Sequence, residues 1–267
     1  MNVVIRAPAA WPSRPAPKRL AAAIVAALGL AGCGSDSTPM KYDPPPAAPL
    51  NGKLTLNVAD TALAGDAPDL ALHVTQSILA QNPNDVQALQ RQGDAYFTLG
   101  QLTQAEDSYR RALTLRPGFA PAQLGLGRIA LTRDPAAADD WFTKVLATDP
   151  RNTAALNDLA IARDMQGRHG EAQTAYRQAL AIAPGDIPAQ VNLGLSLAMS
   201  GNSAEAVTIL RPLATSPSAT PRIRHNYAVA LALNGQTADA EQILRADMSP
   251  SDAATAVQSY RALASGG

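Results

Sequence analysis

Apolar side chains fall at helical spacing along most of the chain, and no stretch alternates apolar and polar residues for long enough to predict a strand. The pattern is clearest between residues 85 and 117. Two apolar stripes lie on either side of Gly100: first Leu89, Tyr96 and Leu99, then Ala105, Tyr109, Ala112 and Leu113. Asp85 can cap the first helix, Gly100 can end it, and Pro117 can end the second. The stretch therefore predicts two antiparallel helices.

This two-helix pattern repeats every 33 or 34 residues. An alanine recurs in the second helix of every copy: Ala71, Ala105, Ala138, Ala172, Ala206 and Ala240. A second small residue precedes it by 11 or 12 positions in five copies: Gly93, Gly127, Ala160, Gly194 and Ala228. A proline closes four copies: Pro83, Pro117, Pro150 and Pro184. The period predicts six helix pairs, at about 52–85, 86–119, 120–152, 153–186, 187–220 and 221–248, followed by a capping helix at 251–264.

Small residues at these places allow close packing. Gly93 and Ala105 let the two helices of a pair approach each other, and the ring of Tyr109 fills the space beside them. A period near 34 with two small residues, a large apolar residue and a closing proline resembles the tetratricopeptide repeat. The resemblance implies an all-α solenoid of about six helix pairs over residues 52–248, with a capping helix and tail over 249–267.

Three copies depart from the pattern. Thr75 stands where other copies have a large apolar residue, so we expect the first pair to be weak. The third pair is one residue short, and its Asp134 and Pro135 can supply the cap and first turn of the second helix. Pro212 falls within the second helix of the fifth pair, where it should kink the helix or end it early.

The first 32 residues have the composition of an export signal. Four basic and no acidic residues accompany an apolar run at 20–30, about half the roughly 20 residues that a membrane-spanning helix needs, so a signal peptide is favoured. The run ends in the motif Leu30, Ala31, Gly32 and Cys33. This motif resembles the lipobox of bacterial lipoproteins, which implies cleavage before Cys33 and acylation of its sulfur and new amino group. A secreted or uncleaved protein and a buried core cysteine are the alternatives.

The segment after the lipobox predicts a tether. Residues 33–51 are rich in Pro, Ser and Gly and have few apolar groups to bury. Without residues 1–32 the chain has 18 basic and 22 acidic residues, and this net charge of −4 gives no electrostatic reason to bind nucleic acid. No aspartate directly follows Cys33. By resemblance to the sorting signals of some Gram-negative lipoproteins, this implies a lipid anchor in the outer membrane, with the protein facing the periplasm.

Residues for catalysis are sparse, and the sequence predicts no enzyme, metal site or cofactor. His73, His169 and His225 lie in different repeats, and Cys33 is the only cysteine. The chain contains neither HExxH nor GxSxG. Residues 125–130, GLGRIA, spell a dinucleotide-type motif, but the repeat places them inside a helix and no strand precedes them. No small-molecule substrate is expected either.

By resemblance to the family, the first helix of each pair supplies residues to a concave groove. The positions carried over are Gln90, Asp94, Phe97, Leu124, Arg128, Leu131, Asn157, Ile161, Met165, Val191, Leu195 and Met199. Some of the apolar ones can instead pack against the neighbouring pair. The Lys/Asn/Arg set with which some members hold a peptide's terminal carboxylate is missing. A partly apolar groove with two methionines favours an amphipathic helix or an extended apolar segment of a protein partner.

The C-terminal segment at 222–263 narrows the resemblance. It contains Asp-Met-Ser-Pro at 247–250, followed by a short helix ending in Ser-Tyr-Arg-Ala at 259–262. This order is similar to the end of the TadD family, the tetratricopeptide lipoproteins of the Flp or tight-adherence pilus. The resemblance implies a scaffold that helps an outer-membrane secretin to localise or multimerise. Two alternatives stay open: a periplasmic adaptor for cell-wall enzymes or outer-membrane protein assembly, and an enzyme.

Overall fold

The computed structural model describes residues 52–265. The predicted signal peptide, lipobox, acylated Cys33 and tether lie outside these residues. The described part forms thirteen α-helices and no strand. Their bounds are α1 Gly52–Ala64, α2 Pro68–Gln81, α3 Val86–Thr98, α4 Leu102–Leu115, α5 Ala120–Leu131, α6 Pro135–Thr148, α7 Thr153–Met165, α8 His169–Ile182, α9 Ile187–Met199, α10 Ser203–Ala214, α11 Pro221–Leu233, α12 Thr237–Leu244 and α13 Pro250–Ser265. Within this part, none of the helices combines the length and apolar character needed to cross a bilayer.

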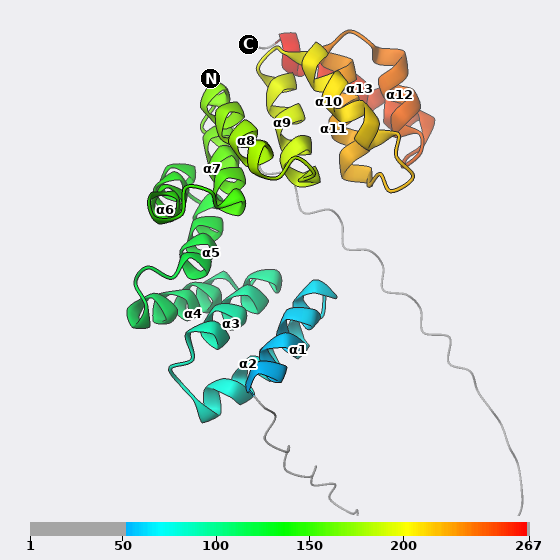
Figure 1. The fold of residues 1–267 in the computed structure, drawn as a ribbon. Helices are drawn as coiled ribbons and strands as arrows, with labels where there is room; N and C mark the ends of the chain where they lie inside the picture. The colour runs from blue at the N-terminus through cyan, green and yellow to red at the C-terminus, as the bar shows by residue number, and fades with distance from the viewer. Residues whose placement is uncertain (1–51, 266–267) are drawn as a thin grey trace, which may run out of the picture. The chain divides into compact units, whose positions relative to one another are not determined.

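The helices follow one another as six pairs, from α1–α2 to α11–α12 (Figure 1). Each helix packs on the next one in the chain, and each first helix, the odd-numbered one of its pair, also contacts the first helix of the next pair. The order and bounds agree with the six pairs expected from the period, so the predicted all-α solenoid is confirmed.

Small residues determine how closely the helices approach. A Cβ atom on Gly93 would lie 2.5 Å from Cε1 of Tyr109, and one on Gly125 would lie 2.3 Å from Cζ of the same ring. The same relation recurs in two further pairs: Gly127 with Cε1 of Phe142 at 2.4 Å, and Gly194 with Cγ of Leu210 at 2.5 Å. The large side chain of each second helix therefore occupies the space that a Cβ would need, as the sequence predicts for Gly93 and Tyr109.

Caps and turns fall where the sequence places them. The side chain of Asp85 accepts hydrogen bonds from two backbone amides at the start of α3, and Asp134 does the same at the start of α6, before Pro135. The turn inside the second pair ends in Gly100 with φ of 73°, a left-handed conformation that favours glycine. Three later pairs have the same turn: Gly167, Gly201 and Gly235.

The two irregular positions are accommodated locally. Thr75 is fully buried, and its hydroxyl donates to the backbone oxygens of Ala71 at 2.9 Å and Leu72 at 3.0 Å, so this hydroxyl is not left unpaired. Pro212 is part of α10, which ends two residues later at Ala214 and has 12 residues where α8 has 14. The proline therefore shortens this helix.

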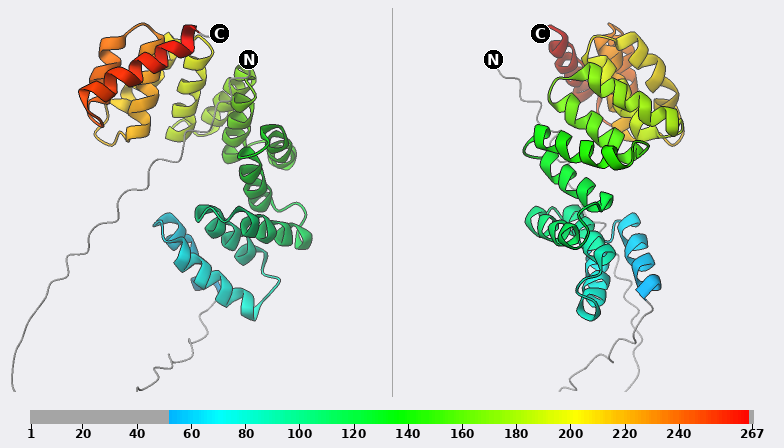
Figure 2. Two further views of the ribbon diagram at one scale, coloured as in Figure 1. Left: turned by 180° about the vertical axis from the view of Figure 1, so that it is seen from behind. Right: turned by 60° about the vertical axis from the view of Figure 1, so that its left-hand side comes forward.

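Helix α13 covers the last pair. It lies against the last pair (Figure 2) and contacts α11 and α12. Its Ala253 and Val257 are buried in the same cluster as Leu231 and Leu244. Ser249 accepts the amide of Asp252 at 3.2 Å, which begins the helix directly after the Asp-Met-Ser-Pro segment. The predicted capping helix is thus present.

Candidate functional site

The sequence places the binding surface on the first helices α3, α5, α7 and α9, and the described structure gives each predicted residue its exposure. Leu124 and Val191 are 9% and 4% exposed and belong to the hydrophobic core, so these two pack between helices. Gln90 is also buried, and Arg128 is exposed. The remaining eight are half-buried: Asp94, Phe97, Leu131, Asn157, Ile161, Met165, Leu195 and Met199.

A row of polar contacts begins on this surface between the first two pairs. Arg91 of α3 donates from Nε to Oδ1 of Asp60 on α1 at 2.9 Å and from Nη1 to Oε1 of Gln90 at 2.8 Å. Gln90 in turn donates to Asp94, one turn further along α3. The hydroxyl of Tyr109 donates to the other carboxylate oxygen of Asp94 at 2.7 Å. The contacts thus run from α1 through α3 to α4.

Asp94 is the electrostatic centre of this part. Burial raises the pKa of its carboxyl group above the ordinary value, against the opposing effects of the Tyr109 hydrogen bond and the cations Arg128 and Arg91. Burial, the negative charge of Asp94 and the hydrogen bond to it raise the pKa of Tyr109, whose hydroxyl therefore stays a donor. The aspartate is held by donors on both of its oxygens rather than left free for a ligand.

The same kind of contact continues from α5 to α11. Arg128 donates from Nε to Oδ2 of Asp158 at 2.7 Å. Asn157 Nδ2 lies 3.4 Å from Oδ1 of the same aspartate, and Asn192 Nδ2 donates to Oδ1 of Asn157 at 3.1 Å. Arg222 Nη2 then donates to Oδ1 of Asn192 at 3.2 Å. One hydrogen bond or ion pair therefore links each first helix to the next from α5 to α11.

We call these polar residues the first-helix chain. Its members are Asp60, Gln90, Arg91, Asp94, Tyr109, Arg128, Asn157, Asp158, Asn192 and Arg222. The sequence prediction includes four of these residues and misses Arg91, Asp158 and Asn192 among the others. All three stand two positions before the recurring small residue. A polar residue that recurs at that place of the repeat is the signal that was available.

Four of the six half-buried apolar residues of the surface lie on α7 and α9. Ile161, Met165, Leu195 and Met199 are half-buried there. Ile161 packs against the largest core cluster, whereas the two methionines stand near the ends of their helices. We call the surface formed by the predicted residues and the first-helix chain the first-helix surface. Apolar side chains are thus most frequent on its α7 and α9 part, whereas Phe97 on α3 and Leu131 on α5 stand beside charged residues.

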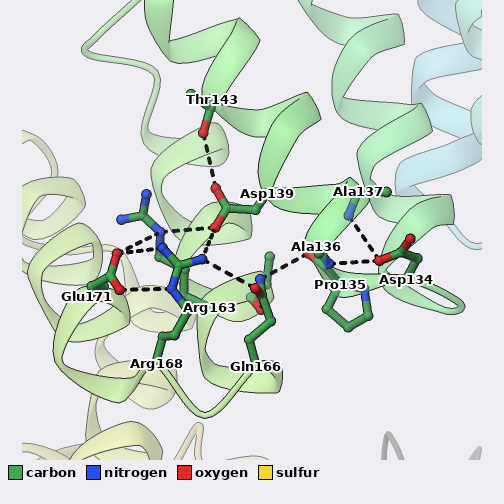
Figure 3. A network of polar contacts seen from close by, with 11 residues as sticks. Asp134, Pro135, Ala136, Ala137, Asp139, Thr143, Arg163, Gln166, Arg168 and Glu171 are labelled. Atoms are coloured by element: carbon green, nitrogen blue, oxygen red, sulfur yellow. Dashed lines mark hydrogen bonds and ion pairs between the residues drawn. The ribbon is translucent and has the colours of Figure 1, made fainter.

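A second polar network joins the third pair to the fourth (Figure 3). Asp139 of α6 accepts hydrogen bonds from Arg163 at 3.3 Å and Arg168 at 2.8 Å, and Arg168 also pairs with Glu171 at 2.6 Å. Gln166 donates to the backbone oxygen of Pro135 at 3.2 Å. The corresponding places at two other junctions hold one contact each: Glu106 with Arg133 at 3.9 Å, and Gln173 with Ser200 at 2.8 Å. These contacts stabilise the packing of neighbouring pairs against each other.

The histidines stay apart. His73 is exposed on α2. Nδ1 of His169 lies 2.9 Å from Oδ1 of Asp164, which also accepts the hydroxyl of Ser196 at 2.7 Å. Burial lowers the pKa of His225 on α11. Among residues 52–265 there is no group of three or more side chains placed to hold a metal ion.

These features define a class of protein: helix pairs that stack in register and present a row of side chains from each first helix. Models described as tetratricopeptide repeat match residues 56–120, 91–144, 124–187, 165–223 and 221–246. The chain belongs to the tetratricopeptide-repeat family, whose members bind protein partners.

Two curated relatives match part of the chain. The cytochrome c-type biogenesis protein CycH of Rhizobium meliloti is 30% identical over 138 residues, which are 50% of this chain and 34% of that protein. The co-chaperone DNJ1 of Fusarium oxysporum, which has tetratricopeptide repeats and a J domain, is 32% identical over 122 residues, 46% of this chain and 22% of that protein. The chain thus spans about a third or less of the length of both relatives.

Solved structures share the fold at low identity. The type IV pilus biogenesis factor PilW superposes with a TM-score of 0.68 at 21% identity, over 78% of this chain and 98% of PilW. A tetratricopeptide-repeat protein of Parabacteroides merdae superposes with a TM-score of 0.61 at 18% identity, over 82% of this chain and 86% of that protein. Both likenesses show the fold alone.

Proposed function

We propose that the protein is a non-enzymatic scaffold that binds a protein partner through its first-helix surface. The observation that carries this proposal is that the surface combines charged side chains, such as the exposed Arg128, with six half-buried apolar side chains, four of which lie on α7 and α9. An amphipathic segment of a partner can pair with the charged groups and cover the apolar ones. The exposed guanidinium of Arg128 offers such a segment a cation beside the buried acid Asp158.

The partner in this proposal is a component of the Flp or tight-adherence pilus, in particular its outer-membrane secretin. Support comes from the resemblance of residues 222–263 to the end of the TadD family. In the fold, the start of that segment is joined to its Asp-Met-Ser-Pro turn, because Arg224 on α11 pairs through two nitrogens with Asp247 before α13. PilW, a type IV pilus biogenesis factor, has the same fold. The protein would help the secretin to localise or multimerise.

The proposal includes a location. Acylation of Cys33 would hold the protein at the outer membrane on the periplasmic side, with residues 34–51 as the tether. The lipobox motif at 30–33 supports this anchor, and the residues that follow it support outer-membrane sorting.

The relative CycH supports a second candidate. Its match covers about half of this chain, and its name assigns it to cytochrome c biogenesis. On this candidate the chain is a periplasmic adaptor for another assembly process, for example of cell-wall enzymes or outer-membrane proteins.

The test is a double substitution on the apolar part of the surface. Leu195→Glu with Met199→Glu places two charges where we expect an apolar contact, and their desolvation should weaken binding. The matched control is Leu70→Glu with Leu115→Glu, two exposed leucines on the second helices α2 and α4. Pull-down of the secretin from solubilised membranes should fall at least about tenfold for the first variant and stay unchanged for the control. Equal recovery with both variants would refute binding through the first helices. Recovery of another assembly complex in place of the secretin would support the second candidate.

A further inference from the structure

One position of the first helices makes the contact with the preceding pair. It lies directly before the recurring small residue. Leu126 of α5 shares a buried cluster with Tyr109 of α4, and Leu159 of α7 shares another with Phe142 of α6. In the last four pairs this residue is only 4–6% exposed: Leu126, Leu159, Leu193 and Tyr227. Each of these apolar side chains is therefore covered by the pair before it.

Val58 holds the same position in α1 and is 42% exposed. It directly precedes the buried Ala59, which stands 12 positions before Ala71, as Gly93 does before Ala105. Among the described residues no pair precedes α1, which contacts only α2 and α3 (Figure 1). A side chain of the kind that the later junctions bury is thus left uncovered at this end of the stack.

Leu70 of α2 can reach the same end. It directly precedes the recurring Ala71, and the equivalent Glu205 of α10 pairs with Arg177 of α8, in the preceding pair, at 3.0 Å. Leu70 is 49% exposed. The other five pairs have a polar or small residue at this position: Gln104, Ala137, Glu171, Glu205 and Asp239. We call the surface that carries Val58 and Leu70 the first-pair end.

The opposite end of the stack is closed. Helix α13 contacts α11 and α12, and its Ala253 and Val257 are buried in their cluster. The last pair of one copy is therefore not free to take the place before α1 of another copy, which would give an open-ended filament. Of the possible contacts between copies, the pairing of two first-pair ends is left, and identical surfaces join around a two-fold axis.

The charges along α1 suit such a pairing. Lys53 belongs to the first turn of α1, whereas Asp66 and Asp69, both exposed, follow its last turn. Two α1 helices that cross a two-fold axis antiparallel bring the first turn of each beside the last turn of the other. Opposite charges then meet twice, and a parallel arrangement would place like charges together.

We propose that the first-pair end is a docking surface for a second copy of the chain. The two copies join through Val58 and Leu70, with their α1 helices antiparallel. The apolar side chains of each copy are removed from water by those of the other, and the charges fix the direction of the helices. The dimer is not required for the binding of another partner through the first-helix surface, so neither proposal decides the other.

Sedimentation equilibrium of the purified full-length chain in density-matched detergent tests the proposal. We expect a monomer–dimer equilibrium. Val58→Glu with Leu70→Glu should weaken the dimer at least about tenfold, because the new charges would lose hydration in the interface. The matched control is Leu115→Glu with Ile187→Glu, the other two exposed large hydrophobic residues of the described chain, which should leave the dimer unchanged. A wild-type chain that stays monomeric, or equal affinities of the two variants, would overturn the proposal.

A charge exchange separates loss of the interface from damage to the fold. Lys53→Glu alone should weaken the dimer roughly 3- to 10-fold, since two exposed ion pairs are lost. Lys53→Glu with Asp69→Lys should restore it, because opposite charges meet again. Failure of the second change to restore the dimer would exclude the antiparallel pairing. Protection of α1 from amide exchange in a chain that stays monomeric would assign the first-pair end to residues 34–51 of the same chain and refute a second copy.

Discussion

The hydroxyl of Tyr109 on α4 donates to the carboxylate of Asp94 on α3 across 2.7 Å, with the tyrosine ring against Gly93 and Gly125. One side chain thus fills the space between helices and satisfies a carboxylate of the first-helix chain. The packing of the second pair and the polarity of its part of the first-helix surface depend on the same residue.

Tyr109→Phe keeps the ring and removes the donor. We expect the free energy of unfolding at neutral pH to fall by about 1–3 kcal/mol, because the half-buried carboxylate of Asp94 loses a partner. Urea denaturation measures the change. Tyr96→Phe is the control, since the Tyr96 hydroxyl on α3 has no hydrogen bond in the structure, and a loss of the same size there would contradict the assignment.

The stability contributed by Asp94 should depend on pH. Burial raises its pKa in the folded state above the ordinary 3.8, so the folded protein favours the protonated form. The contribution of Asp94 to the free energy of unfolding is therefore fully present below pH 3.8. It is lost as the pH rises through the pKa that Asp94 has in the folded protein. Compared with Asp94→Asn, the wild-type chain should become relatively less stable between about pH 3 and about pH 7. Urea titrations at several pH values measure this difference, and the opposite slope would show that the nearby arginines dominate.

Gly125→Ala should disturb the junction between the second and third pairs. The new Cβ would lie 2.3 Å from the Tyr109 ring, and overpacking of this kind costs about 1–3 kcal/mol. A lower melting temperature in thermal unfolding is the expected result. Gly118→Ala serves as the control, because no atom lies within 4 Å of the added Cβ. Equal melting of the two variants would argue against the close approach.

Arg224→Met should loosen the C-terminal helix. The hydrogen bond from Arg224 lowers the pKa of Asp247, so this pair stabilises the fold above the ordinary value of 3.8, and its effect is lost as the pH falls through the lower folded value. At neutral pH we expect amide exchange in α13 to speed up about tenfold or more, since hydrogen bonds to charged groups contribute about 1.5–3 kcal/mol. Exchange in α3 should not change. Uniform acceleration in both helices would mean that the pair acts on the whole domain.

Cys33→Ala tests the anchor. If the thiol is the acylation site, radiolabelled lipid should no longer be incorporated, and the precursor should remain at the inner membrane. Membrane fractionation measures where the variant is located, and a blot for secretin multimers measures whether the scaffold still works. Persistent lipid labelling would end the lipoprotein interpretation, whereas normal multimers made by the misplaced protein would show that the anchor is dispensable.

The fold followed from the sequence because its determinants are local. The signals for a helix, such as apolar spacing, the turn at Gly100 and the cap at Asp134, depend on residues close in sequence. Because the period is 33 or 34 residues, each kind of signal recurs in several copies. The small residue at Gly93 and the ring of Tyr109 could also be paired, because the repeat fixes which face of each helix meets the other.

The exposure and contacts of the first-helix surface could be predicted only in part from the sequence. Whether Leu124 and Val191 reach the surface depends on the rotation of each helix, and a rotation of a fraction of a turn moves a residue into the core. The link from Arg128 to Asp158 joins residues 30 positions apart, so it requires the relative placement of two helix pairs.

The contacts between helix pairs also bear on how the domain can change over generations. Since each pair is fastened mainly to its neighbours, loss or duplication of a whole 34-residue unit would leave similar surfaces to meet at the new boundary. The length of the first-helix surface can therefore vary in steps of one pair. The last pair cannot be exchanged in this way, because Arg224 of α11 pairs with Asp247 in the segment that leads into α13. Lineages that lengthen or shorten this domain should do so inside it and keep the terminal pair with its capping helix.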